Sequence, residues 1–209
     1  MLNTIAATGM ALSLLLSPAI PQAPTPPPDK ITVDVVTVNG SGCPAGTAAV
    51  AVASDNTAFT VTYSDYLAKV GPDAGPTDYR KNCQLALRIH YPQGFTYAIN
   101  QADYRGFASL ASGATGLERA NYYFQGMSAT ARSSHPFNGP FQDDWQATDR
   151  ADSSSLVFAP CGEDRLLNVN TELRVSAGSS SGSNTSFMSM DSTDGSIHTT
   201  YHFSWKQCP

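Results

Sequence analysis

The residue types that could do chemistry are concentrated in four short stretches of the chain. A glycine loop around a thiol, "GSGCPAG", could cradle a phosphate, and "GSSSG" formally matches a nucleophile elbow. "FQDDWQ" places two carboxylates side by side, and "SIHTTYHFSW" spaces two histidines as a helical zinc site would. Each of these chemistries requires a particular local structure.

The two glycine-rich stretches do not meet those requirements. "GSGCPAG" (40–46) is one residue longer than the dinucleotide fingerprint, lacks the Gly-Lys-Ser/Thr of a Walker loop, and loses a backbone N–H at Pro44. It predicts a tight turn that presents Cys43. "GSSSG" (178–182) lies in a serine-rich run with no helical pattern after it, so we predict a hairpin loop.

The acidic and histidine pairs fail on geometry as well. Apolar residues alternate through "SIHTTYHFSW", which predicts a strand, and four strand residues separate His198 and His202 by roughly 13 Å. Asp143 and Asp144 are adjacent on an extended chain and point in opposite directions, so they are not a ready acid–base pair. We therefore assign no catalytic residue, no metal site and no cofactor.

Composition and the first residues indicate a secreted protein. Charged residues make up 14% of the chain and the net charge is -5, with no basic run, which argues against a nucleic-acid partner. Residues 1–19 have the uncharged apolar run and small-residue cleavage site of a signal peptide. Residues 20–30 are a proline-rich spacer. We expect one domain over residues 31–209, with no membrane association after cleavage.

The four cysteines predict two structural disulfides. Cys43, Cys83, Cys161 and Cys208 contain no CxxC pair, so neither a zinc knuckle nor a thioredoxin-type redox pair is supported. Four thiols permit three pairings, and the sequence does not choose among them. We take the pairing of neighbours, Cys43 with Cys83 and Cys161 with Cys208, as the expectation.

After the spacer the chain reads as strand after strand, because apolar residues recur with a period of two and turn signals follow every eight to fifteen residues. The pattern predicts one antiparallel β-sandwich, jelly-roll-like, of about ten strands, with residues 128–152 as its longest irregular segment. "SDYLAKV" (64–70) fits either one helical turn or an irregular strand. The expected strands cover 31–38, 47–53, 57–63, 84–91, 95–100, 104–110, 120–126, 154–159, 165–175 and two C-terminal segments beginning at 185 and 196.

Aromatic residues and glycosylation sequons mark the candidate ligand-facing positions. In "NYYFQG", Tyr123 points opposite to Tyr122 and Phe124, and Trp145 lies in the segment expected to be irregular, so Tyr123 and Trp145 are the candidate ligand-facing rings. Asn39 and Asn184 begin Asn-x-Ser sequons, which are usable in a eukaryotic host.

An ordered set of motifs resembles a known family. "VNGSGCPAGTAAVAVASDNTAFTVTY", "RKNCQLALRIHYPQGFTYAI", "DYRGFASLASG", "YYFQG", "LNVNTELRV" and "YHFSWKQC" are similar to the secreted domain of unknown function 4360 family of filamentous fungi and actinobacteria. The resemblance covers about residues 33–208 and implies a secreted, disulfide-containing β domain. It transfers no catalytic residue.

These observations favour a secreted, non-enzymatic β-sandwich associated with the cell surface or cell wall, with cell-wall polysaccharide as the candidate ligand. Two alternatives stay open. One is a secreted hydrolase whose site is assembled from loops, with Asp143, Asp144 and His135 as the nearest candidates. The other is an effector or inhibitor that binds another extracellular protein, which a large exposed apolar patch would favour.

Overall fold

The computed structural model describes residues 25–190 and 198–209. The expected signal peptide (1–19), residues 20–24 of the expected spacer and residues 191–197, where the last expected strand begins, lie outside the described residues. Everything described is strand, turn or irregular chain, and no described residue is helical.

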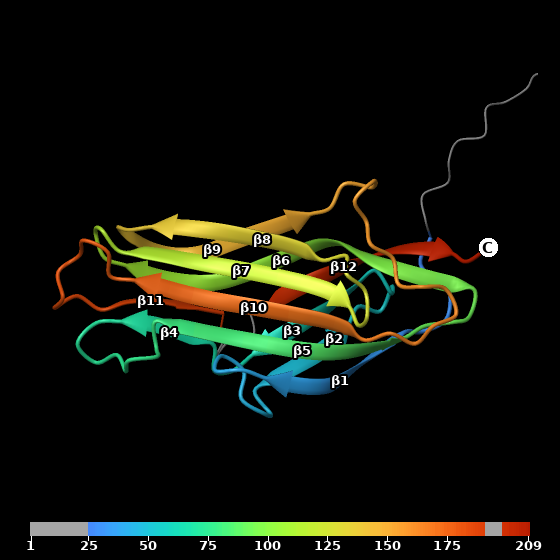
Figure 1. Cartoon of the computed structure of the whole chain (residues 1–209), viewed down its shortest axis with the longest axis horizontal. Coiled ribbons are helices and arrows are strands. Elements are labelled where there is room, and N and C mark those ends of the chain that lie inside the picture. Colours follow the sequence, from blue (N-terminus) through green and yellow to red (C-terminus); the bar gives the residue numbers. More distant parts are fainter. Residues whose placement is uncertain (1–24, 191–197) are drawn as a thin grey trace, which may run out of the picture.

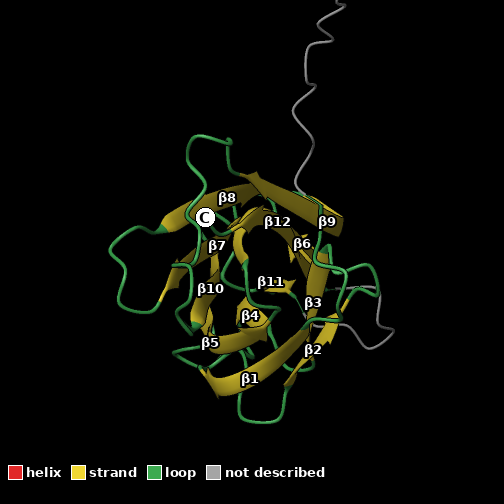
Figure 2. Cartoon of the chain, turned by 90° about the vertical axis from the view of Figure 1, so that its right-hand side faces the viewer, coloured by secondary structure: helices red, strands yellow, loops and turns green. Residues whose placement is uncertain are grey.

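Two antiparallel sheets form a sandwich whose strands run along the long axis of the molecule (Figure 1). The five-stranded sheet contains, in spatial order, β1 (Thr32–Asn39), β5 (Arg80–His90), β10 (Leu167–Ser176), β7 (Thr115–Phe124) and β8 (Ala131–Asn138). The seven-stranded sheet contains β2 (Ala48–Val52), β3 (Ala58–Tyr63), β12 (Thr199–Gln207), β6 (Phe95–Leu110), β11 (Ser186–Ser189) and β4 (Leu67–Val70), with β9 (Phe141–Arg150) paired to β6. The end-on view shows the sheets enclosing one core, with β8 and β9 at one edge and β1 and β2 at the other (Figure 2).

The core consists of the inward-facing residues that the period of two predicts. Phe59, Val61 and Tyr63 are at most 2% exposed, and Leu167, Val169, Leu173 and Val175 are at most 1% exposed. Near the Cys161–Cys208 end the core is aromatic, because the Tyr97 ring contacts the rings of four neighbours: Tyr91, Phe124, Phe203 and Trp205. The all-β sandwich is therefore confirmed.

The single strand β6 organises the seven-stranded sheet. Its 16 residues pair with β12 through Phe95–Asp103 and with β11 through Phe107–Ser109 along one edge, and with β9 through Gln101–Leu110 along the other. At Gly106 an added Cβ would lie 2.0 Å from the carbonyl oxygen of Ser189 and 2.4 Å from the Trp145 ring. Glycine is required there because three strands and an indole approach one Cα.

The segment 128–152 was expected to be irregular, and this is wrong. It forms β8 and β9, which follow each other in the chain but belong to different sheets, and 154–159, expected to be a strand, is turn and irregular chain. The inward positions of β8 include Ser133 and His135, so apolar and polar residues do not alternate along this strand. The sequence therefore lacks the period of two that predicts a strand. Pro136 is tolerated because β8 is an edge strand. The stretches 95–100 and 104–110 are both part of β6, and "SDYLAKV" contains the short strand β4.

Both disulfides join neighbouring cysteines, as expected. Cys43–Cys83 lies inside the core, with both residues at most 1% exposed, whereas Cys161 is exposed. The turn before Cys43 packs closely, because a Cβ on Gly42 would lie 2.3 Å from the Tyr66 ring. The glycine loop "GSGCPAG" (40–46) thus brings the Cys43 thiol into the core beside β5.

We expect Cys43→Ala/Cys83→Ala to lower the free energy of unfolding by about 4 kcal/mol, from the loss of a 40-residue loop closure in the unfolded chain. Urea unfolding followed by tryptophan fluorescence measures this. The Cys161–Cys208 bridge closes a similar loop of 47 residues but lies at an exposed end. We therefore expect Cys161→Ala/Cys208→Ala to lower the free energy of unfolding by no more than the first variant does. A larger loss from the exposed bridge would contradict the assignment of Cys43–Cys83 as the core bridge.

Candidate functional site

A row of polar side chains crosses the outer face of the five-stranded sheet. The register pairs Asn39 of β1 with Gln84 of β5, Gln84 with Asn170 of β10, Asn170 with Asn121 of β7, and Asn121 with Arg132 of β8. Residues paired in an antiparallel sheet point to the same side, so all five side chains lie in one line. We call Asn39, Gln84, Asn170, Asn121 and Arg132 the polar row. At 4.7–4.9 Å per strand it spans roughly 19 Å.

The side chains of the polar row are not used by the protein itself. Within residues 25–190 and 198–209, none of the five makes a side-chain hydrogen bond or an ion pair. The Oδ1 atom of Asn121 has no hydrogen-bond partner in that part of the chain but is covered, so the capacity open to a partner lies in the other polar atoms of the row. Amide groups have donor and acceptor capacity to offer to a partner, and here that capacity is uncommitted.

The outer face of the seven-stranded sheet behaves differently. There Asp103 accepts hydrogen bonds from Gln101 at 2.7 Å and from Thr148 at 2.6 Å, and its Oδ2 lies 2.9 Å from Nε2 of His202. Partial burial raises the pKa of Asp103, but these hydrogen bonds and the imidazole outweigh it and lower that pKa overall. These side chains satisfy one another, although others on that face, such as the exposed Arg105, have no ion pair in the described residues. The five-stranded sheet differs in that its uncommitted side chains lie in one line across all five strands.

Tyr123 lies beside the polar row, whereas Trp145 does not. Tyr123 is paired with Asn168 of β10 on the outer face. This pair lies two residues along the strands from the polar row, at the next outward position, and Tyr123 is half-buried. Trp145 is 3% exposed and its ring packs 5.2 Å from that of Phe137 in the sandwich interior. Trp145 is therefore not ligand-facing, because it lies at an inward position of β9.

A second polar cluster is buried where β8 and β9 meet. Nε2 of His135 lies 2.7 Å from Oδ1 of Asp149, and Asp149 also accepts hydrogen bonds from the hydroxyls of Tyr104, at 2.9 Å, and Ser133. Glu118 lies 3.9 Å from the same His135 nitrogen. These contacts join the edge strands of the two sheets through side chains.

Glu118 is the most unusual ionisable group in the structure. Its side chain is fully buried, and neither carboxyl oxygen has a hydrogen-bond partner in the described residues. Burial, followed by the charge of Asp149, raises the pKa of Glu118 well above its usual value. The carboxyl group is therefore protonated under conditions where an exposed glutamate is charged.

The buried cluster does not have the geometry of a hydrolase. In a nucleophilic triad the histidine stands between the serine and the carboxylate, but here Ser133 and His135 both bond to Asp149. His135 is thus oriented by Asp149 without being in position to take the Ser133 proton. Asp143 and Asp144 lie exposed on β9, away from this cluster, so the three residues of the hydrolase hypothesis do not share a cleft.

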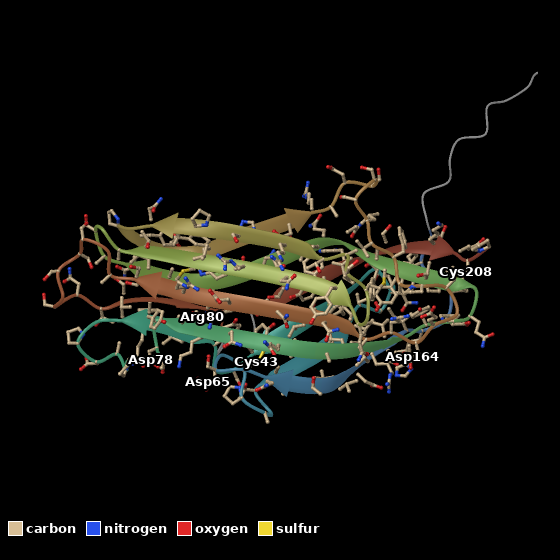
Figure 3. The ribbon with its side chains drawn as sticks, in the orientation of Figure 1. Cys43, Asp65, Asp78, Arg80, Asp164 and Cys208 are labelled. Atoms are coloured by element: carbon tan, nitrogen blue, oxygen red, sulfur yellow. A yellow bond between two sulfur atoms is a disulfide. The ribbon has the colours of Figure 1, made fainter. Side chains whose placement is uncertain are left out.

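A groove of about 700 Å³ lies at the end of the sandwich, lined by the turn between β5 and β6, residues 161–164 and the last two residues. Asp164 and Cys208 mark this end (Figure 3). Its carboxylates are already paired, Asp164 with Arg88 at 3.3 Å and Glu163 with Arg165 at 2.6 Å. The groove therefore offers fewer uncommitted groups than the polar row.

The remaining candidates are distributed over the surface. Asn39 and Asn184 are both exposed, at the end of β1 and in the loop between β10 and β11. Among the described residues four large hydrophobic side chains are exposed, and only Val35 and Val36 of these are adjacent in the chain. This is not the large apolar patch that a protein-binding surface would show.

The amides of the polar row were not singled out from the sequence. Asn168 and Asn170 alternate with buried Leu167, Val169 and Thr171, so their outward direction was readable. Their alignment with Asn121 and Gln84 was not, because strand order and register are long-range properties. Glu118 gave no signal either, since a polar residue on a strand is normally assigned to the outer face.

Comparison with known proteins gives a family but no activity. Residues 29–208 match the family described as "Domain of unknown function (DUF4360)". An "Uncharacterized secreted protein" of the fungus Arthroderma benhamiae is 36% identical over 183 residues, covering 88% of this chain and 74% of the relative. In the described part of the chain, no helix is long and apolar enough to cross a membrane.

We expect Glu118→Gln to stabilise the protein increasingly as the pH rises. The folded state holds the Glu118 proton more tightly than the unfolded state, so the wild type loses stability as the pH rises above the unfolded pKa of roughly 4.3. The gain of the variant should grow by up to about 1.4 kcal/mol per pH unit until the folded pKa is passed. Urea unfolding at a series of pH values measures it.

The groups facing Glu118 are Asp149, His135 and five tyrosines, namely Tyr63, Tyr66, Tyr104, Tyr122 and Tyr201. Burial raises the pKa of each of these tyrosines, so they stay neutral across the pH range of the experiment. Glu163→Gln, at an exposed glutamate, is the matched control and should show no such trend. A pH-independent effect of Glu118→Gln would mean that Glu118 is ionised in the folded protein.

Proposed function

The chain belongs to the family described as "Domain of unknown function (DUF4360)", and from this premise and the outer face of the five-stranded sheet we propose that it is a secreted polysaccharide-binding protein. The observation that supports the proposal is the polar row, with its five aligned and uncommitted side chains. The expected ligand is a polysaccharide of the cell wall or cell surface.

Sugar hydroxyls both donate and accept hydrogen bonds, and side-chain amides do the same, so a row of amides suits a hydroxyl-rich chain. Because the row crosses five strands, a ligand along it would lie across the sheet and meet a new side chain at every strand. Tyr123 adds an aromatic surface beside the amides, on which the apolar face of a sugar ring can pack.

The scaffold favours preorganised binding. Asn121 and Asn170 are half-buried on β7 and β10, two interior strands that each pair with a neighbour on both sides. Little further ordering is needed when a ligand binds to such strands, and ordering is a main cost of association. The Cys43–Cys83 bridge fixes the β1 side, since Cys83 directly precedes Gln84.

We expect Asn121→Ala/Asn170→Ala to weaken binding to insoluble chitin, glucan or peptidoglycan by about tenfold or more, because each lost hydrogen bond costs about 0.5–1.5 kcal/mol. Tyr123→Ala should weaken it further. Sedimentation with the washed polysaccharide, followed by quantification of free protein, measures the affinity.

Gln146→Ala is the matched control, because Gln146 is an exposed amide on β9, in the other sheet. It should bind as the wild type does. If the wild type binds none of these polysaccharides and does not bind polygalacturonate either, the proposal of polysaccharide binding is wrong. Equal loss in the Gln146→Ala variant would move the binding surface away from the polar row.

A further inference from the structure

The face that carries the polar row is locally basic although the chain as a whole is acidic. The net charge is -5, yet five arginines point outward from the strands of the five-stranded sheet, against two outward carboxylates, Asp34 and Glu172, in these strands. The arginines are Arg80, Arg88, Arg119, Arg132 and Arg174. Figure 3 places Arg80 at the end of β5 beside β10.

Three of these arginines are neutralised within the protein. Arg80 and Arg174 both donate to Glu172, at 2.6 and 2.8 Å, and Arg88 pairs with Asp164 at 3.3 Å. Burial raises the pKa of Glu172, but the two guanidinium groups outweigh it and lower that pKa, so the carboxylate stays charged and holds both. These three side chains are committed to internal pairs.

Arg119 and Arg132 form no ion pair among the described residues, although Arg119 lies opposite Glu172 of β10, whose carboxylate is held by Arg80 and Arg174. Arg119 and Arg132 are both exposed, and neither has a carboxylate partner in the described part of the chain. The only side-chain contact of the Arg119 guanidinium among these residues is a 3.2 Å hydrogen bond from its Nε to the hydroxyl of Ser134. The two unpaired positive charges lie on neighbouring strands at the end of the polar row.

Their positions suit a single shared anion. Arg119 is opposite Ser134 and Arg132 is opposite Asn121, so the two arginines are diagonal neighbours on β7 and β8. Diagonal neighbours are roughly 7–8 Å apart, which is within the reach of long side chains. A guanidinium group presents a planar fork of N–H donors that matches a carboxylate in bidentate fashion.

We propose that the ligand of this face is an acidic polysaccharide, whose uronic acid carboxylate binds between Arg119 and Arg132 while its hydroxyls meet the amides of the polar row. This deepens the polysaccharide binding proposed above and rests on it. The charge complementarity is local, because the net charge of -5 repels a polyanion at longer range. Binding therefore depends on contact between the carboxylate and the two guanidinium groups.

Polygalacturonate is the probe, and its methyl-esterified form, a neutral β-glucan and polyglutamate are the comparison polymers. The full-length protein from a host that does not modify sequons is titrated by calorimetry. Arg119→Ala/Arg132→Ala should weaken polygalacturonate binding at least tenfold. Arg119→Lys/Arg132→Lys should recover part of it, since lysine keeps the charge but loses the fork. Arg105→Ala is the matched control, because Arg105 is exposed and also has no ion pair in the described residues.

The expected result is full loss in the double alanine variant, partial loss in the double lysine variant and none in Arg105→Ala. The ester and polyglutamate should bind weakly, and binding should weaken as NaCl rises from about 0.1 M to about 1 M. Equal affinity for the neutral glucan and the ester, unchanged in the double variant, would overturn the acidic ligand and leave polysaccharide binding standing. Equal affinity for polyglutamate would also overturn it, since charge alone would then suffice. Binding of no polysaccharide would overturn both proposals. Unfolding curves check that each variant is folded.

Discussion

The candidate face depends on the register between β5, β10 and β7. A slip of one residue in any of these pairings would turn the outward amides into the core and the core residues out to solvent. The register is held by the buried side chains on the opposite face, such as Leu85, Val169 and Ala120, which are at most 2% exposed. The position of the polar row is therefore fixed by core packing on the opposite face of the same strands.

The same constraint explains why the inward and the outward polar groups of the strands behave so differently. In the interior, Glu118 cannot escape its position on β7, so it remains buried next to Asp149 and the shifted pKa keeps it neutral. A buried charge without partners would cost several kcal/mol, and protonation avoids most of that cost. The hydrogen bonds of Asp149 to Ser133, His135 and Tyr104 then join β8 and β9, which belong to different sheets.

On the outer face, by contrast, uncommitted amides and guanidinium groups remain in water and cost little. On the five-stranded sheet these unused hydrogen-bonding groups line up across every strand. The seven-stranded sheet uses its outer polar groups internally around Asp103, and the end groove uses its carboxylates in ion pairs. The proposed binding uses what the strands present and not loops, which sets it apart from the loop-assembled hydrolase site considered from the sequence.

The sequence by itself determined the all-β class and the direction of most side chains on each strand, because alternation is a short-range property. It left three cysteine pairings open, and the structure contains the expected one. The sequence did not reveal the strands β8 and β9, because the inward residues of β8 include Ser133 and His135 in place of apolar ones. Only the tertiary structure buried Trp145, brought Glu118, His135 and Asp149 together, and aligned Asn39, Gln84, Asn170, Asn121 and Arg132 in one row. Those arrangements join strands far apart in the chain, and strand order and register are decided by how the whole core packs.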